Sequence, residues 1–136
     1  MGGDGNGYML MHTFDLIGVV VDWLDACRAR RLNDLLDLYD ANGSLRCACS
    51  EPFIYQGRDD LFRYWSVRLE RSVPHAFSLV DLEISDESSI RMSYLGYDGR
   101  PVEARFSFTN TGRIADMRCI AAATSSTMTS VMLPTP

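Results

Sequence analysis

Between His75 and Ile120 the sequence alternates apolar and polar residues, and turns that carry glycine interrupt the alternation. A period of two is typical of antiparallel strands with one buried and one exposed face. The buried face needs a cover, and nearly all of the helical pattern in this chain lies before His75. We therefore expect an α+β fold: a cone-shaped barrel made of a curved antiparallel sheet, covered by three N-terminal helices, with a pocket inside the cone.

Apolar residues at helical spacing predict the three helices, over Phe14–Arg28, Leu32–Tyr39 and Arg58–Arg71. Thr13 is expected to cap the first helix, and Asn42-Gly43 to end the second and turn the chain. The strands are expected over Ser44–Cys49, Phe53–Tyr55, Ala76–Ile84, Ser89–Tyr97, Val102–Thr109 and Arg113–Ile120.

Length and composition predict one folded domain over residues 12–121, between a disordered leader (1–11) and a flexible tail (122–136). Met1, Met9 and Met11 are each candidate start residues. The leader lacks the basic region and apolar core of a secretory signal, and no apolar run approaches the roughly 18 residues of a membrane span. We therefore expect a cytoplasmic protein that does not bind membranes.

Charge and cysteine content exclude several classes of chemistry. The net charge is −5 without a basic stripe, so we expect no nucleic-acid partner. All 13 basic residues are arginine, which excludes lysine Schiff bases and lysine general bases. Cys27, Cys47, Cys49 and Cys119 are expected to be reduced in the cytoplasm. Cys47 and Cys49 lack a second ligand pair or a nearby histidine, so we expect neither a metal nor another cofactor.

The turn at Asp98-Gly99 decides which face of the neighbouring strands points inward. A two-residue hairpin would place Arg91 on the same face as Phe106, where it could hold an anion or a carboxylate. A three-residue loop with Gly99 as a bulge would instead place Met92 and its apolar neighbours there. Asp-Gly is typical of the first arrangement, whereas a wholly apolar lining, which we prefer, requires the second.

Three stretches stand out together: WLDACRARRLNDLLDLY at 23–39, GRDDLFRYWSVRL at 57–69 and FSFTNTGRIADMRC at 106–119. In this order they resemble the helix-turn-helix opening, the third helix and the last hairpin of the nuclear transport factor 2-like superfamily. Its SnoaL-like and steroid delta-isomerase-like members are the most similar. The resemblance covers about residues 12–121. It implies a cone-shaped α+β barrel, commonly a homodimer through the outer face of the sheet.

Other residues occupy the positions at which the isomerases keep their catalytic side chains. Trp23 stands in place of a tyrosine donor, Cys47 in place of the aspartate base and Ala104 in place of a protonated aspartic acid. Since that reaction needs a base and an oxyanion donor, the resemblance does not support it here. Members resembling scytalone dehydratase use cavity histidines, whereas His12 and His75 lie at the edges of predicted elements.

The candidates for catalysis are Cys47, Arg91, Asp116 and His75. Cys47 could act as a thiolate, but without a nearby histidine or lysine we favour a small apolar residue in the pocket wall. Asp116 and Arg118 could form an inward carboxylate–guanidinium pair, although we favour a charge lattice on the outer face. His75 is the one histidine within the folded region that could titrate near neutrality, and we expect it to be exposed.

We expect the pocket to bind a small hydrophobic or aromatic molecule. One hypothesis is an isomerase-, dehydratase- or cyclase-type enzyme without the steroid-isomerase catalytic residues. The alternative is a non-catalytic ligand-binding or dimeric interaction module. A titratable group deep in the cavity favours an enzyme, and a lining of carbon and sulfur favours binding. The expected lining residues are Trp23, Tyr39, Cys47, Tyr64, Trp65, Met92, Ala104, Phe106, Met117 and Cys119.

Overall fold

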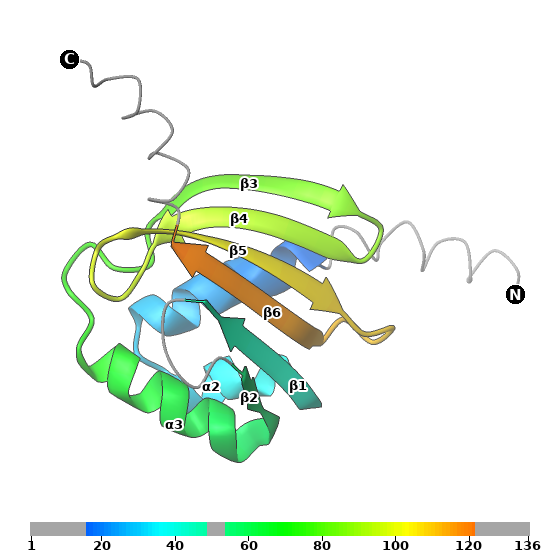
Figure 1. The fold of residues 1–136 in the computed structure, drawn as a ribbon, viewed down its shortest axis with the longest axis horizontal. Coiled ribbons are helices and arrows are strands. Elements are labelled where there is room, and N and C mark those ends of the chain that lie inside the picture. The colour runs from blue at the N-terminus through cyan, green and yellow to red at the C-terminus, as the bar shows by residue number, and fades with distance from the viewer. Residues whose placement is uncertain (1–15, 49–53, 122–136) are drawn as a thin grey trace, which may run out of the picture.

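A computed structural model, which describes residues 16–48 and 54–121, shows a curved six-stranded sheet with helices on one side (Figure 1). The first helix is described over residues 16–28, α2 spans Leu32–Asp37 and α3 spans Gly57–Glu70. The strands are β1 (Tyr39–Cys47), β2 (Ile54–Gln56), β3 (Leu79–Asp86), β4 (Ser89–Leu95), β5 (Pro101–Phe108) and β6 (Ile114–Ala121). Below, the inner face of the sheet is the one that the helices cover, and the outer face is the opposite one.

The α+β class is confirmed, and the sheet adds two features to the expected one. Its strand order is β2-β1-β6-β5-β4-β3, which is an open series. β1 pairs with β6 in parallel, so the sheet is mixed and not wholly antiparallel. Period-two alternation identifies the two faces of a strand but not the direction of its neighbour, so the sequence could not reveal this pairing. The third helix follows β1 and β2, in the order that the predicted ranges gave.

The second helix is shorter than expected, and Tyr39 is not part of it. α2 ends at Asp37, and Tyr39 opens β1 opposite Ile114 of β6. The backbone N–H of Ile114 donates a hydrogen bond to the carbonyl oxygen of Leu38 at 2.9 Å. The predicted end of this helix was therefore wrong, because Tyr39 pairs with β6 and adopts an extended conformation directly after α2.

Asn42-Gly43 was also wrongly predicted to end the helix and turn the chain. Both residues lie inside β1, in an irregular stretch where the pairing register shifts between Tyr39 and Ser44. A β-carbon at position 43 would lie 2.9 Å from the carbonyl oxygen of Ile114. The glycine therefore allows the bulged strand to approach the backbone of β6 closely.

The meander begins later than expected, at Leu79 and not at Ala76. The preceding residues form turns in which Phe77 adopts a left-handed φ of 62°. This conformation costs a non-glycine residue on the order of 1–3 kcal/mol. Its ring is 1% exposed and lies 6.1 Å from that of Trp23, and its N–H donates to the carbonyl oxygen of Leu95. These contacts offset the strain.

The expected cap Thr13 lies outside the described residues, as do Phe14, Cys49 and Phe53.

The β4–β5 connection is the three-residue loop. The backbone N–H of Gly96 donates to the carbonyl oxygen of Arg100 at 2.8 Å, and Gly99 has a φ of +83°. Met92 is consequently fully buried on the inner face, and Arg91 lies on the outer face. The apolar inner lining of β4 is therefore confirmed, together with the glycine bulge that produces it.

The hydroxyl of Tyr39 lies where the helices meet the sheet. It accepts hydrogen bonds from the indole N–H groups of Trp23 in the first helix and Trp65 in α3, both at 3.2 Å. It donates one to Sδ of Met117 in β6, also at 3.2 Å. Trp23 is fully buried, and its ring meets those of Trp65 and Phe106 edge-on at 5.4 and 5.3 Å. One hydroxyl thus connects two helices to two strands.

No helix in the described part of the chain is long and apolar enough to cross a bilayer.

We predict that Tyr39→Phe lowers the free energy of unfolding by about 2–4 kcal/mol, because two buried indole N–H groups lose their acceptor. Urea unfolding followed by circular dichroism measures the change. Tyr55→Phe is the matched control, because the hydroxyl of this half-buried tyrosine makes no hydrogen bond within the described residues. The control should lose less than about 0.5 kcal/mol. Equal losses in the two variants would contradict the role assigned to Tyr39.

Candidate functional site

A cavity of about 410 Å³ lies between α3 and the β4–β5 loop. Its aromatic lining consists of Tyr64, Trp65, Phe77, Tyr94 and Tyr97. The charged residues that reach it are Arg68, Asp98 and Arg100. A volume of this size, with aromatic walls and a few polar groups, is typical of a small-molecule site.

The ten expected lining residues lie in three settings. Tyr64, Trp65 and Cys119 line this cavity. Cys47 is buried and lines a separate hollow together with Cys119. The remaining six are buried in the packed interior and do not line the cavity: Trp23, Tyr39, Met92, Ala104, Phe106 and Met117. Side chains therefore fill much of the expected cone pocket, and this cavity lies beside them.

Two tyrosine hydroxyls in the cavity wall have no hydrogen-bond partner within the described part of the chain. Tyr64, from α3, is 6% exposed, and Tyr94, from β4, is 3% exposed. Burial raises the pKa of both hydroxyls, and the nearby thiol of Cys119 raises each pKa further. Both hydroxyls therefore remain protonated. Each is a hydrogen-bond donor whose desolvation no acceptor in residues 16–48 or 54–121 compensates.

Arg68 follows Tyr64 by one helical turn on α3 and also lines the cavity. Its guanidinium lies 3.7 Å from the centre of the Tyr64 ring and 5.5 Å from that of Tyr97. One of its N–H groups donates to the backbone carbonyl oxygen of Tyr64 at 3.4 Å. Asp98 is bound elsewhere: it accepts the backbone N–H of Arg100 at 3.0 Å and pairs with the Arg100 guanidinium at 3.7 Å.

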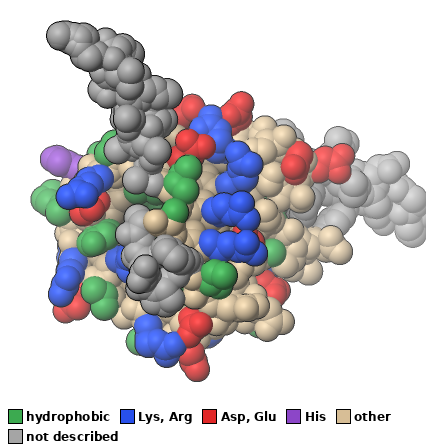
Figure 2. All heavy atoms as spheres, in the orientation of Figure 1, with side chains coloured by type: hydrophobic (Ala, Val, Ile, Leu, Met, Phe, Trp, Pro, Cys, Tyr) green, Lys and Arg blue, Asp and Glu red, His purple; other side chains and the backbone are tan. Residues whose placement is uncertain are grey.

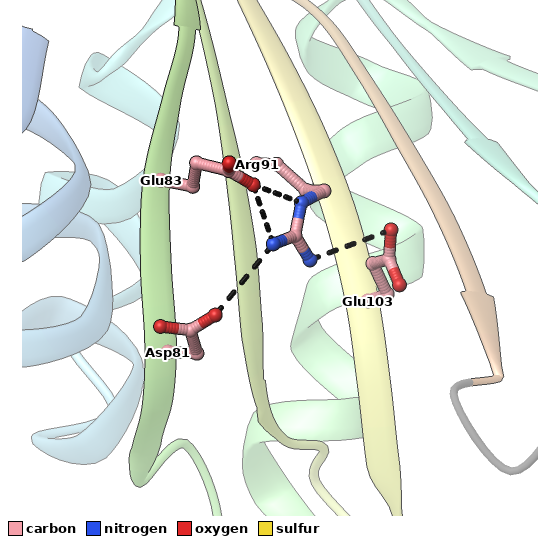
Figure 3. Close-up of polar contacts among 4 residues, drawn as sticks. All are labelled: Asp81, Glu83, Arg91 and Glu103. Atoms are coloured by element: carbon pink, nitrogen blue, oxygen red, sulfur yellow. Dashed lines mark hydrogen bonds and ion pairs between the residues drawn. The ribbon is translucent and has the colours of Figure 1, made fainter. Parts of the chain in front are cut away.

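Arg91, one of the candidate catalytic residues, lies on the outer face (Figure 3). Its Nε and Nη2 donate to Oε1 of Glu83 at 2.9 and 2.6 Å. It also forms ion pairs with Asp81 at 3.6 Å and Glu103 at 3.7 Å. Its hydrogen bonds to Glu83 raise the pKa of Arg91. Three carboxylates on the outer face thus hold this guanidinium away from the cavity.

Asp116 likewise lies on the outer face, where it accepts a hydrogen bond from Oγ of Ser44 at 2.6 Å. Its ion-pair partner is Arg46 at 3.4 Å, whereas Arg118 forms no ion pair within the described residues. His75 is exposed in the turns before β3. The structure therefore does not bring the four catalytic candidates together in one site.

Four arginines form a row across the outer face, visible as the blue column in Figure 2. Arg91, Arg105, Arg118 and Arg46 are direct neighbours on β4, β5, β6 and β1. Arg91 and Arg46, at the two ends of the row, bind carboxylates. The exposed Arg105 and Arg118 between them form no ion pair among the described residues. Like charges on neighbouring strands repel, so this row of arginines is stabilised where carboxylates lie beside it.

Sequence reasoning missed several polar groups of the cavity, and the signals for them differ. Arg68 lies four residues after Tyr64, and this spacing on one side of a helix could have identified it. Tyr94 lies two residues after Met92, so the period of two in this strand could have identified it as a lining residue. Asp98 and Arg100 are loop residues, and nothing local in the sequence indicates that their loop lies near α3.

No protein-family model and none of the curated proteins matches the chain. Solved structures do match its fold. A SnoaL-like protein of unknown function from Burkholderia thailandensis has a TM-score of 0.68 and 18% identity, covering 77% of this chain and 92% of that one. A steroid delta-isomerase from Pseudomonas aeruginosa has a TM-score of 0.54 and 16% identity, covering 78% of each chain.

The epoxide hydrolase/cyclase-like enzyme SalBIII, which is described in pyran ring formation in the polyether salinomycin, is also similar. Its TM-score is 0.58 at 14% identity, covering 80% of this chain and 92% of that one. These structures confirm the expected fold, which this chain shares with SnoaL-like and steroid delta-isomerase structures. At such identities a shared fold does not transfer an activity.

We predict that the protein loses stability above about pH 10. Burial raises the pKa of Tyr39, Tyr64 and Tyr94, so these hydroxyls stay protonated in the folded state. In the unfolded chain they ionise near pH 10, so their contribution is fully present below that pH and is lost above it. Each lowers the free energy of unfolding by about 1.4 kcal/mol per pH unit there.

Urea unfolding at half-unit steps between about pH 8 and 11 measures this slope. The absence of lysine removes a large class of groups that would otherwise titrate in this range. Tyr94→Phe should reduce the slope by about 1.4 kcal/mol per pH unit. Tyr55→Phe serves as the control variant. A free energy of unfolding that stays constant through this range would overturn the prediction.

Proposed function

We propose that the protein binds a small hydrophobic or aromatic molecule with a hydrogen-bond acceptor in the cavity beside α3. The observation that carries this proposal is the pair of buried hydroxyls, Tyr64 and Tyr94, that lack partners among the described residues. A ligand carbonyl or hydroxyl oxygen could accept a hydrogen bond from them and remove the cost of their desolvation. The aromatic walls, which include Trp65 and Tyr97, favour a planar ring.

Binding without turnover is the function that we infer first. Proton-transfer chemistry needs a base within hydrogen-bond reach of the substrate. Asp98 is the carboxylate among the described lining residues, and it is already bound to Arg100. Tyr64 and Tyr94 have a raised pKa, so they polarise an acceptor but do not remove a proton.

An isomerase- or cyclase-type enzyme is the second candidate. The same two hydroxyls favour it, because paired donors can stabilise an oxyanion that develops from a carbonyl. Steady turnover of a cyclic enone by the wild-type protein, lost in Tyr94→Phe but not in Tyr55→Phe, would support catalysis. Binding of the enone without turnover would support the binding function.

We predict that 2-acetylnaphthalene binds about tenfold more tightly than 2-ethylnaphthalene, because only the ketone accepts a hydrogen bond. The two probes have nearly the same shape, and isothermal titration calorimetry measures both affinities. Tyr94→Phe should remove most of the preference and leave the affinity for 2-ethylnaphthalene within about twofold. Tyr55→Phe should leave both affinities unchanged. If neither probe binds up to its solubility limit, the proposed pocket function is wrong.

We also propose that the chain forms a homodimer through the outer face, as the family resemblance implies. None of the helices that the structure describes covers this face, and Ile120 on it is 43% exposed. The carboxylates Asp81 and Glu83 lie on β3 at one edge, whereas Arg118 and Arg46 lie on β6 and β1, with Asp116 paired to Arg46. A two-fold axis would place the acidic end of each copy over the arginine end of the other.

We predict that Glu83→Arg and Arg118→Glu each weaken the dimer, because each variant sets like charges against one another across the two-fold axis. Mixing the two variants should restore a dimer of twice 15.3 kDa, since each pair then joins opposite charges. Sedimentation equilibrium measures the mass. Arg100→Glu, in the β4–β5 loop, is the control and should remain dimeric. A monomeric wild-type protein would contradict this proposal.

A further inference from the structure

Arg68 differs from the neighbouring arginines of α3 in having no carboxylate partner. Arg58 pairs with Asp37 at 2.9 Å, and Arg63 pairs with Asp60 on the same helix. No carboxylate of the described residues lies within ion-pair distance of Arg68, although this side chain is partly buried. A partly desolvated cation without a counter-charge favours an anion from outside the chain.

Two tyrosine rings hold the Arg68 guanidinium at the cavity without neutralising it. The group lies 3.7 Å from the ring centre of Tyr64 and 5.5 Å from that of Tyr97, and both rings line the cavity. Attraction to the ring faces orients the guanidinium. Its one side-chain hydrogen bond among the described residues, to the carbonyl oxygen of Tyr64, uses one of five N–H donors. Most of its donors are therefore available to a ligand.

The carboxylate of Asp98 does not fill this role, even though it lines the same cavity. Its Oδ1 accepts the backbone N–H of Arg100, which fixes the turn, and its Oδ2 faces the Arg100 guanidinium. Both oxygens of the Asp98 carboxylate thus interact with Arg100 of the same loop. Arg68 remains the cation that is oriented toward the cavity by its aromatic neighbours.

From this arrangement we infer that the ligand is a planar aromatic carboxylic acid whose carboxylate binds Arg68. The inference rests on the proposed function, since it names the chemical class of the ligand for the same cavity. The planar fork of a guanidinium matches the two oxygens of a carboxylate. One cation balances one negative charge, which favours a carboxylate over a phosphate dianion. The aromatic rings of Trp65 and Tyr94 supply the surface for the planar ring.

The test compares 2-naphthoate with 2-naphthamide, which has nearly the same shape and no charge. In the wild-type protein at pH 7.5 and low salt, the acid should bind at least about tenfold more tightly by isothermal titration calorimetry. Arg68→Met should abolish this preference and leave the affinity for the amide within about twofold, which also shows that the variant is folded. Arg68→Lys should retain part of the preference, because it keeps the charge but not the fork. Arg63→Met, on the same helix, is the matched control.

The outcomes separate this inference from the proposed function. If the wild-type protein binds the acid and the amide equally, the assignment of Arg68 is wrong and the pocket remains. If the preference for the acid survives in Arg68→Met, another cation, with Arg100 the next candidate, holds the carboxylate and the inference is overturned. If neither probe binds, the proposed function fails together with it.

Discussion

The hydroxyl of Tyr39 is the point through which the helical layer is joined to the sheet. It is the common acceptor of Trp23 and Trp65, which come from different helices, and it donates to Met117 of β6. Indole N–H groups can only donate, so each buried tryptophan needs an acceptor at a defined position. Packing alone would allow the helices to slide over the apolar face, whereas these directional bonds allow one arrangement.

That arrangement keeps the interior under the sheet packed with side chains. Trp23 fills the space under the sheet, and its one polar atom is committed to Tyr39. Cys47 and Ala104 are small, buried residues on neighbouring parts of the inner face. These residues thus serve packing. Polar chemistry is displaced to the cavity beside α3, where Tyr64 and Tyr94 retain hydroxyls without partners among the described residues.

The two faces of the sheet follow from one register. The glycine bulge at Gly99 sets a register in which Met92 points inward. Its neighbour Arg91 therefore points to the opposite, outer face, where it binds Glu83. The same β4–β5 pairing places Arg91 beside Arg105, and the separate β5–β6 pairing places Arg105 beside Arg118. For β4, an apolar inner face and a charged outer face are therefore two consequences of one turn.

By itself, the sequence determined the α+β class, the two faces of the meander and the register preference of β4. These follow from period-two patterning and from turn chemistry, both of which act between residues close in the chain. Only the tertiary structure decided that Tyr39 leaves its helix to join β1, since that choice depends on pairing with Ile114. The same holds for the cavity, which forms because α3 and the β4–β5 loop meet. Contacts between segments far apart in sequence leave no local pattern, so the placement of Arg68 beside Tyr97 required the folded chain.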